Sequence, residues 1–387
     1  MDIGLFTDTF IPIADGVGRV VLAYAETLPK LGAQVTVSAP LYHFGNRAML
    51  PFDLIDYSAI KIPTISQYST GSPVLDTHYR RRMRAAKIDI AHAHSPFAAG
   101  VEAVRIAKAK GIPLVGTFHS KYYDDFYKAT KSETISKALV SNVVSFYEKC
   151  DEVWAVSSST ADVLYSYGFN GEIIVMPNGV NFRTLNEDKL KEVEEKYGIG
   201  DKKMLLFVGQ IDYKKNIKLV LESAALLKKS GVDFILILAG RGPDKKSIKA
   251  DIKELGIKDN TKLIGHIDDS ALLDALYARA RAFVFPSLYD NAPMVVREAA
   301  VMSTPSILIN GSSAAEIVED GVNGFLCDNT PESLFEKLKL LLDNKELAEN
   351  AGKNAKESIP VSWENIISKA LKRYEALMES SNYKYKK

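Results

Sequence analysis

Short apolar runs alternate along the chain with longer segments whose apolar residues recur at helical spacing. Such alternation is typical of parallel sheets whose two faces are covered by helices. The expected strands are residues 2–7, 34–39, 88–94, 113–118, 152–157 and 172–176 in the first half, and 203–209, 233–240, 261–266, 282–286 and 305–309 in the second. About a dozen strands are too many for one comfortable open sheet, so we expect two doubly wound α/β domains.

Turn chemistry predicts where the two domains meet. The stretch "MPNGVNF", residues 176–182, contains Pro-Asn-Gly and is followed by a charged segment. The last predicted helix, from about residue 363 to 378, has no strand after it, so we expect it to cross back to the first domain. The predicted domains are residues 1–177 with 361–387, and residues 178–360. Doubly wound folds bind ligands at the carboxyl ends of their strands, which predicts a site in an interdomain cleft.

Composition narrows the function classes. The 387 residues are 47% hydrophobic and 25% charged, and the net charge of +1 argues against bulk nucleic-acid binding. Cys150 and Cys327 form no paired motif, which disfavours a disulfide framework or a zinc site and fits a reducing compartment. The start, "MDIGLFTDTF", is unlike a signal peptide, and no run reaches the roughly 18 apolar residues of a membrane span. We therefore expect a cytoplasmic protein.

Gly16 and Gly18 open a predicted helix after the first strand. A dinucleotide fingerprint fits poorly, because Val21 holds the third glycine position and no acidic residue ends the second strand. Exposed backbone N–H groups at such a helix start suit close approach by a ligand. A plain loop with a glycine N-cap explains the same residues equally well.

Histidines follow or end two of the predicted strands. His119 comes directly after residues 113–118, so it is expected at the mouth of the cleft, where a catalytic and a structural role are equally plausible. His92 and His94 share one strand face, which is a spacing that could bind a metal. Histidines whose ring nitrogens are satisfied within a buried parallel strand are the favoured interpretation for that pair.

Two further loops of the second half carry candidate ligand groups. Lys214 and Lys215 lie just before a predicted helix, where a lysine can meet a phosphate or simply be solvated. The turn at residues 238–244 is rich in glycine, with Pro243 expected at the first position of a helix. A tight turn between strand and helix explains these glycines without a ligand.

The stretch "PSLYDNAPMVVREAA", residues 286–300, leaves a strand and enters a helix that we expect to begin at Pro293. The N–H groups near residues 292–295 would bind a phosphate at the helix start. Asp290 precedes this anion site and Glu298 follows it, so one carboxylate on each side is available for hydroxyl groups. That layout suits a nucleotide-sugar; Asp290 as a helix cap and Glu298 as a solvated residue is the competing interpretation.

Taken together and in order, these motifs resemble the retaining glycosyltransferases of family four, which have the GT-B fold of two Rossmann-like domains. The resemblance runs nearly end to end, and its anchors are specific in this order and spacing although each is loose alone. They are "ADGVGRVV", "AHAHSPF", "GTFHS", "WAVSSSTADVL", "VMPNGV", "FVGQIDYKKNI", "LAGRGP", "LYARARAFVFPSLYDNAPMVVREAAVMSTPSI" and "EIVEDGVNGFL".

The resemblance implies a role for each matching position. Glu298 would hold ribose hydroxyls, Asp290 would hold hydroxyls of the donor hexose, and Lys215 would bind phosphate. His119 would sit beside the donor sugar and, with Asp290 and Lys215, make up the catalytic set. The remaining implied donor-binding residues are Gly16, Gly18, Gln210, Lys214, Asn291, Ala292, Pro293, Met294 and Val295, and Glu316 lies in a segment that usually has two glycines before it.

The chain departs from the family pattern at several of these positions. Asp290 stands where Glu is usual, and Gln210 stands where an arginine usually contacts the diphosphate, a charge that Lys214 is expected to replace. Pro293 lies in an Ala-Pro-Met triplet that replaces Phe-Gly-Leu, and Ser303 replaces a glycine. These departures bear on donor affinity and on the identity of the sugar. The resemblance further implies retention of anomeric configuration, no required metal or cofactor, and stabilisation of the leaving diphosphate by Lys215 and the helix amides.

The acceptor is expected in the first domain. One predicted helix there carries Arg80, Arg81, Arg82 and Arg84, and a later one carries Tyr122 and Tyr123 among lysines. Basic and aromatic groups together suit an anionic membrane surface, as in diacylglycerol glucosyltransferases, so peripheral membrane contact is expected. A solvated charged face explains the same residues equally well, and a cell-envelope glycan or a small molecule remains open as acceptor.

Within the family, UDP-glucose is the first expected donor and GDP-mannose the second. Two other classes of function are kept. A nucleotide-sugar epimerase of the same architecture would consume the donor without an acceptor. A nucleotide-sugar-binding protein would bind the donor without turnover.

Overall fold

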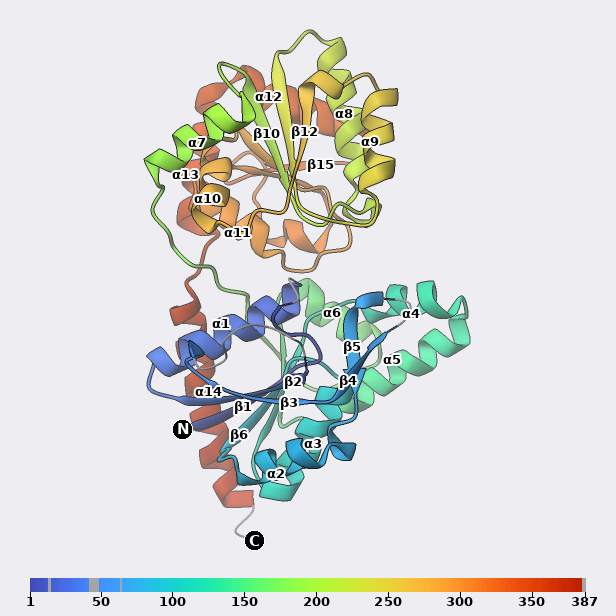
Figure 1. Ribbon diagram of the computed structural model, residues 1–387, viewed down its shortest axis with the longest axis vertical. Helices are drawn as coiled ribbons and strands as arrows, with labels where there is room; N and C mark the ends of the chain where they lie inside the picture. The colour runs from blue at the N-terminus through green and yellow to red at the C-terminus, as the bar shows by residue number, and fades with distance from the viewer. Residues whose placement is uncertain (13–14, 42–48, 63–64, 385–387) are drawn as a thin grey trace. The chain divides into compact units, whose positions relative to one another are not determined.

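The computed structural model describes residues 1–12, 15–41, 49–62 and 65–384. The chain divides into two compact units. Unit 1 comprises Met1–Gly179 together with Trp363–Lys387, and unit 2 comprises Val180–Ser362 (Figure 1). Among the described residues, no helix is both long enough and apolar enough to cross a membrane.

Unit 1 is built on a seven-stranded sheet in the order β3-β2-β1-β6-β7-β8-β9, with every neighbouring pair parallel. A separate antiparallel pair, β4 and β5, follows β3 in the chain. The strands are β1 (Asp2–Phe6), β2 (Gln34–Pro40), β3 (Asp53–Tyr57), β4 (Ala59–Ile62), β5 (Ile65–Gly71), β6 (Ile90–Ala93), β7 (Leu114–Phe118), β8 (Glu152–Ala155) and β9 (Ile173–Val175).

Helices pack on this sheet through apolar residues that recur at helical spacing and so lie on one face of each helix. In the first helix Val20, Val21, Tyr24, Ala25 and Leu28 are buried, and the Asp15 side chain caps the helix start. The helices are α1 (Gly16–Lys30), η2 (Pro73–Leu75), α2 (Thr77–Ala85), α3 (Ala98–Lys110), α4 (Tyr122–Thr130), α5 (Glu133–Tyr147), α6 (Ser158–Ser166) and α14 (Trp363–Lys384).

Helix α14 belongs to unit 1, although the whole of unit 2 precedes it in the chain. It contacts α1, and the Tyr374 hydroxyl lies 2.5 Å from Nδ1 of His92 on β6. Arg373 binds Glu152 on β8. The predicted return of the last helix to the first domain is therefore confirmed.

Unit 2 has a six-stranded parallel sheet in the order β12-β11-β10-β13-β14-β15. Strand β11, "FILILA", is buried along its whole length, as expected where helices cover both faces. Its elements are α7 (Glu187–Tyr197), β10 (Lys203–Val208), η3 (Tyr213–Lys215), α8 (Ile217–Lys229), β11 (Phe234–Ala239), α9 (Lys245–Glu254), η4 (Lys258–Asn260), β12 (Thr261–Gly265), α10 (Ser270–Arg279), β13 (Ala282–Val284), α11 (Met294–Val301), β14 (Ser306–Ile309), η5 (Ser313–Ile317), β15 (Phe325–Cys327), α12 (Pro331–Asp343) and α13 (Lys345–Ser358).

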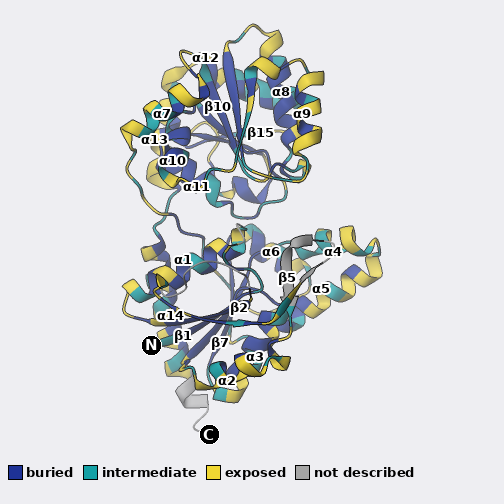
Figure 2. Cartoon of the chain, viewed as in Figure 1, coloured by how far each residue is buried: buried dark blue, intermediate teal, exposed yellow. Residues whose placement is uncertain are grey.

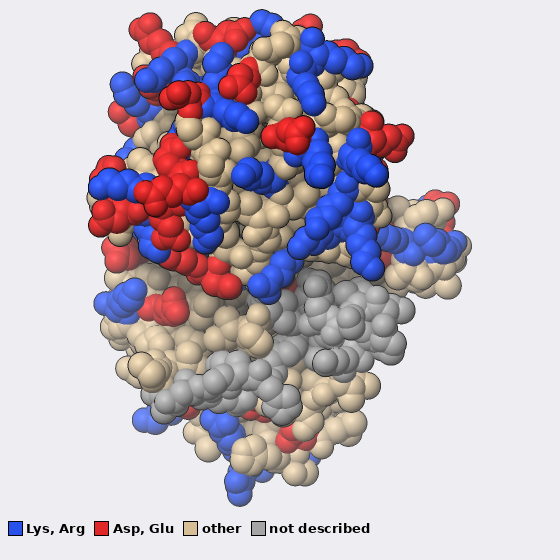
Figure 3. All heavy atoms as spheres, turned by 45° about the horizontal axis from the view of Figure 1, so that its top comes forward, with Lys and Arg blue, Asp and Glu red and all other residues tan. Residues whose placement is uncertain are grey.

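In each unit the apolar strands are buried and the polar faces of the helices are exposed, as the sequence pattern predicts. Figure 2 shows strands β1, β2, β7 and β10 buried, with exposed residues on the outer faces of helices such as α7, α9 and α13. Lys and Arg side chains and Asp and Glu side chains are both spread over the face shown in Figure 3. The small net charge thus reflects charges of both signs at the surface.

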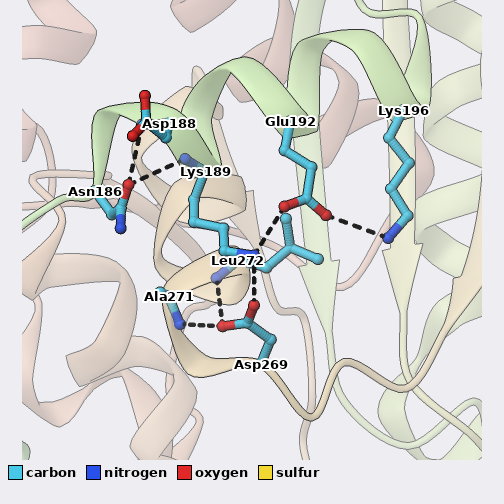
Figure 4. Close-up of polar contacts among 8 residues, drawn as sticks. All are labelled: Asn186, Asp188, Lys189, Glu192, Lys196, Asp269, Ala271 and Leu272. Carbon is cyan, nitrogen blue, oxygen red and sulfur yellow. Dashed lines mark hydrogen bonds and ion pairs between the residues drawn. The ribbon is translucent and has the colours of Figure 1, made fainter.

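Charged contacts join α7 to the start of α10 in unit 2. Nζ of Lys189 lies 2.8 Å from carboxylate oxygens of both Glu192 and Asp269, and Glu192 is 3.7 Å from Lys196 (Figure 4). Asp269 also caps α10 by accepting from the backbone N–H of Ala271. This network helps to hold the first helix of unit 2 against the helix that supports the candidate site.

The pattern missed four strands and misplaced three helix ends. Strands β3, β4, β5 and β15 were not predicted, since they are short or at sheet edges, where alternation gives a weak signal. Helix α14 runs to Lys384 and not to residue 378. Helix α9 begins at Lys245 after Asp244, so the prediction that Pro243 occupies its first position is wrong. The third correction, at Pro293, concerns the site itself.

Candidate functional site

The carboxyl edge of the unit 2 sheet brings together the loops after β10 and β13. These strands are parallel neighbours, and the chain proceeds from β10 outward to one edge of the sheet and from β13 to the other. In doubly wound sheets, ligands bind at the carboxyl ends of the strands at this switch point. Residues 209–216 and residues 285–293 form the two loops.

An ion pair joins the two loops. Nζ of Lys215 donates to both carboxylate oxygens of Asp290, at 2.7 and 2.8 Å. Ser287 Oγ donates to the same carboxylate at 2.5 Å. The lysine is 9% exposed, so this charge is held in place by its partner and is shielded from solvent. Asp290 is therefore no helix cap, and the competing interpretation of that residue is wrong.

A second lysine lies beside the Lys215–Asp290 pair, over the ring of a tyrosine. Nζ of Lys214 lies 4.8 Å from the centroid of the Tyr289 ring, and Nζ of Lys215 lies 5.1 Å from the same centroid. Both distances are in the range of cation–π attraction. Tyr289, in the loop after β13, thus lies beside two lysines of the loop after β10. Gln210, in the same loop as the lysines, is exposed and carries no charge.

Helix α11 begins at Met294, one residue later than predicted. Pro293 precedes the helix as its N-cap, because its ψ of 126° is extended and no side chain caps the helix there. The first-turn N–H groups of any helix lack intrahelical acceptors and favour an anion. Asn291 and Pro293 are buried, whereas Ala292, Met294 and Val295 are partly exposed around this helix start.

Glu298 is a buried residue of α11 and is not solvated. It is 4% exposed, and the Tyr277 hydroxyl on α10 donates to its Oε2 at 3.2 Å. Asp274 on the same helix accepts two hydrogen bonds from Arg183, at 2.5 and 2.7 Å. The hydrogen bonds from Arg183 to Asp274 raise the pKa of Arg183, and the charges of Asp274 and Glu298 raise it further. The carboxylate of Glu298 is therefore buried and held in place by a hydrogen bond, and the interpretation of Glu298 as a solvated residue is wrong.

Backbone packing accounts for the glycines of the turn at 238–244. A Cβ on Gly240, whose φ is +145°, would lie 1.8 Å from the carbonyl oxygen of Gly209. A Cβ on Gly242 would lie 2.2 Å from the carbonyl oxygen of Ile211. Two neighbouring turns therefore approach too closely for side chains, as the interpretation without a ligand predicts.

In unit 1, the glycine loop enters α1 as predicted, and its two glycines differ. Asp15 accepts from the backbone N–H of Gly18 at 2.6 Å, and a Cβ on Gly18 would come within 2.9 Å of the same Asp15 oxygen. Around Gly16 there is open space, and that residue is exposed. Gly18 is thus explained by the cap, while Gly16 leaves backbone accessible at the helix start.

The three histidines lie together at the carboxyl ends of β6 and β7 in unit 1. His92 is satisfied through Tyr374 and through Thr117 Oγ1, 2.7 Å from its Nε2, so the structural interpretation of His92 is right. Nδ1 of His94 lies 3.1 Å from Nε2 of His119. Burial lowers the pKa of all three, that of His119 to about 3, so their imidazoles are neutral near pH 7.

The residues proposed for the acceptor lie on different elements of unit 1. Helix α2 packs against β3 and exposes Arg80, Arg81 and Arg84, while Arg82 is partly buried. Helix α4 packs against α5 and carries the two tyrosines (Figure 1). The arginines and tyrosines therefore belong to two separate surfaces and do not form one patch.

The tyrosines of α4 are part of an aromatic cluster. The Tyr122 ring contacts Phe97 at 5.3 Å and Phe126 at 6.0 Å between centroids. Tyr123 stacks on Tyr127 at 6.3 Å. Phe97 is 42% exposed and Tyr127 is 48% exposed, so this cluster presents large apolar surface to its surroundings.

Sequence reasoning did not identify Ser287, Tyr289 or Tyr277 as parts of the unit 2 site. Ser287 and Tyr289 stand in the quoted loop, where a hydroxyl three residues before an acid could have been noticed. Tyr277 supports Glu298 from another helix, 21 residues away in the chain. No local sequence pattern predicts a contact between residues so far apart in the chain.

Known families match both units. The model of glycosyltransferase family 4 matches residues 14–183, and the model of glycosyl transferases group 1 matches residues 189–358. The first match lies within unit 1 except for its last four residues, and the second lies within unit 2.

Relatives align along most of the chain. The alpha-monoglucosyldiacylglycerol synthase of Acholeplasma laidlawii is 26% identical over 400 residues, covering 100% of both chains. The synthase of the same name from Streptococcus pneumoniae is 28% identical over 338 residues, covering 84% of this chain and 75% of that one. Anabaena HepE, solved with UDP and glucose, has the same fold, with a TM-score of 0.77 at 16% identity over 97% of this chain and 99% of that one. The chain therefore belongs to the GT-B glycosyltransferases of group 1 and family 4, with homology to glucosyl- and mannosyltransferases of cell-envelope glycolipid synthesis.

Proposed function

We propose that this glycosyltransferase moves glucose from UDP-glucose to a diacylglycerol-type lipid, with retention of configuration and without a metal. The observation that carries the proposal is the Lys215–Asp290 pair at the switch point of unit 2, with buried Glu298 behind it on α11. One cation and two separated carboxylates suit a ligand with a diphosphate between two hydroxyl-rich sugars.

Each part of the donor has a matching group in unit 2. The diphosphate lies against Lys215 and the first-turn amides of α11, and Lys214 supplies further positive charge. Asp290 accepts from hydroxyls of the hexose, and Glu298 accepts from the ribose. An ammonium group has three N–H donors, and Asp290 takes two, so the third is left for a phosphate oxygen.

The same groups favour bond cleavage. As the bond from the sugar C1 to the diphosphate breaks, negative charge grows on the leaving oxygen, where Lys215 and the α11 amides stabilise it. The acceptor oxygen forms the new bond to C1 on the same face, and its proton passes to the leaving diphosphate. Neither step calls for an enzyme nucleophile or a metal.

Glucose and a lipid are proposed from similarity together with the unit 1 surface. Two relatives are named for alpha-monoglucosyldiacylglycerol synthesis, and HepE was solved with UDP and glucose. Phe97 and Tyr127 are exposed, and helices α4 and α5, which pack against each other, carry lysines such as Lys128 and Lys137. Apolar rings flanked by cations suit the interface of an anionic membrane.

A transfer assay tests the donor and the mechanism. The full chain is incubated with UDP-glucose or GDP-mannose and with vesicles of phosphatidylglycerol containing diacylglycerol, in EDTA or in Mg²⁺. We expect a glucosyl lipid from UDP-glucose, equal rates in both buffers, and an α-anomeric product by NMR. Donor loss without acceptor would indicate an epimerase, and binding without turnover would indicate a nucleotide-sugar-binding protein.

A sedimentation assay with the same vesicles tests the membrane surface. We expect the double variant Phe97→Ser, Tyr127→Ser to lose vesicle binding and lipid transfer while keeping its affinity for UDP. The triple variant Arg80→Gln, Arg81→Gln, Arg84→Gln is the matched test of α2. If it alone abolishes sedimentation, the α4 surface is not the membrane contact.

A further inference from the structure

Arg297, on helix α11, is a buried cation whose guanidinium lacks partners. The residue is 4% exposed, and its Nε and Nη1 atoms are buried without a hydrogen-bond partner among the residues that the structure describes. Burial lowers the pKa of Arg297 to about 10, so the group still carries its charge near pH 7. Arginines are almost never buried without a paired anion, because an unpaired buried charge strongly destabilises the fold. A bound anion would remove that destabilisation.

The charge of Glu316 attracts Arg297 but does not satisfy it. This attraction raises the pKa of Arg297 less than burial lowers it, and neither Nε nor Nη1 of the arginine donates to a carboxylate. Arg183, in the same unit, differs in this respect. Its Nε and Nη2 donate to the two oxygens of Asp274, at 2.5 and 2.7 Å. Arg183 is thus paired within the chain, whereas Arg297 is not.

The guanidinium of Arg297 lies at the carboxyl edge of the unit 2 sheet. Arg297 is the fourth residue of α11, which begins at Met294. Side chains on a helix lean toward its N-terminus, so a long side chain at the fourth position extends back along the first turn. Glu316, whose charge acts on Arg297, belongs to η5, which follows β14. Because β13 and β14 are parallel neighbours, the segments that follow them lie at the same edge as the donor site proposed above.

Other groups at this edge also favour an anion. No side chain caps the start of α11, where Pro293 is the N-cap. The first-turn N–H groups carry the positive end of the helix dipole, which repels a cation such as Arg297 and attracts an anion. Ser312 Oγ, just before η5, is likewise buried without a partner among the described residues, and a hydroxyl can donate to an anion.

We propose that Arg297 binds a phosphate of the nucleotide-sugar donor at the start of α11, as a second cation besides Lys215. An arginine presents parallel N–H groups from Nε and Nη2, a fork that matches two oxygens of one phosphate. Nη2 is not among the enclosed atoms, so a ligand reaches the guanidinium from that side. The identity of the ligand as a nucleotide-sugar rests on the proposed function; the binding of a phosphate-type anion does not.

The stability of the ligand-free chain is the first test. Arg297→Met keeps an unbranched side chain and removes the charge, so we expect a higher urea midpoint than in wild type, measured by circular dichroism. Arg183→Met is the matched control, because it leaves the buried carboxylate of Asp274 without its partner and should lower the midpoint. A lower midpoint in Arg297→Met would show that Arg297 is paired within the chain and would overturn the inference.

Calorimetric titration of the full chain with UDP, uridine and inorganic pyrophosphate is the second test. We expect Arg297→Met to bind UDP and pyrophosphate about tenfold or more weakly than wild type, because hydrogen bonds from a charged donor to a phosphate are strong. The affinity for uridine, which has no phosphate, should be unchanged. Arg297→Lys keeps the charge but not the fork, so it should fall between the two.

Pyrophosphate separates this inference from the proposed function. If pyrophosphate binds wild type and not Arg297→Met, while UDP binds neither, the inference stands and the proposed donor is wrong. If UDP and pyrophosphate bind wild type and Arg297→Met equally, the inference is overturned and the proposed donor stands. If neither ligand binds wild type, both are overturned.

Discussion

Lys215 and Asp290 lie 75 residues apart in the chain, and the lysine Nζ donates to both oxygens of the aspartate at 2.7 and 2.8 Å. The pair exists because β10 and β13 are parallel neighbours whose following loops meet. It holds together the lysine that we propose binds the donor's phosphate and the aspartate that we propose binds its hexose.

Breaking this pair should affect both stability and transfer. Lys215→Met leaves the Asp290 charge in a largely buried position, and we expect the free energy of unfolding of unit 2 to fall by about 2 kcal/mol. The specificity constant for the donor should fall by about a hundredfold, because charge on the leaving diphosphate loses its cation. Chemical denaturation and initial rates measure the two effects.

Substitutions of Asp290 provide the matched comparison. Asp290→Glu restores the acid usual in the family and should keep activity within about tenfold, whereas Asp290→Asn removes the negative charge and should lower kcat by about a hundredfold. Equal activity in Asp290→Asn and wild type would show that the carboxylate has no part in the transfer.

Tyr277 should tune nucleotide affinity without touching the donor. Tyr277→Phe removes the hydroxyl that donates to Glu298, and hydrogen bonds to charged groups contribute about 1.5–3 kcal/mol. We expect weaker UDP binding by calorimetry, about tenfold, because Glu298 is less well oriented. Glu298→Gln should weaken binding at least as much. Unchanged affinity in both variants would contradict the assignment of Glu298 to the ribose.

The Arg183–Asp274 pair should be important for the stability of unit 2. Asp274 is 3% exposed at its side chain, so Arg183→Ala leaves a buried charge without its partner and should cost about 3–5 kcal/mol in unfolding free energy. The double variant Arg183→Leu, Asp274→Leu should recover most of the loss. Lys196→Ala, which removes a longer and exposed contact, is the control and should have little effect.

Asp8 should make the stability of unit 1 depend on pH. Burial raises the pKa of this carboxyl from 3.8 to about 6, although its Oδ1 accepts from the Ala99 N–H. The folded state therefore disfavours the charged form. Below about pH 4 the group is protonated in both states and there is no cost; the cost grows through pH 6 to at most about 3 kcal/mol, at about 1.4 kcal/mol per pH unit.

Asp8→Asn tests that dependence. We expect the variant to be more stable than wild type at pH 7.5, and the difference to shrink to about 1 kcal/mol near about pH 4.5. Tryptophan fluorescence reports this unfolding, since both tryptophans, Trp154 and Trp363, belong to unit 1. The difference in stability between Asp76→Asn and wild type should not change with pH over this range, because hydrogen bonds lower the pKa of Asp76 to about 2. A flat difference for Asp8→Asn would contradict the raised pKa.

The periodicity of apolar residues was sufficient to predict the class of fold. Parallel strands such as β11 are apolar along their whole length, and the helices between them repeat at 3.6 residues, so both leave a local signal. The loop around Asp290 was also found, because turn residues and a proline follow a strand there. Short edge strands such as β15 left too weak a signal to be predicted.

Two α/β domains, and a loop with two carboxylates beside a helix start, could be predicted from periodicity and motifs alone. The groups that those carboxylates meet became known from the folded chain: Lys215 for Asp290, and Tyr277 for Glu298. The folded chain likewise shows that His94 faces His119. The physical reason is that periodicity and turn chemistry act between near neighbours in the chain, whereas these contacts depend on the order of strands in the sheet and on how helices pack over it.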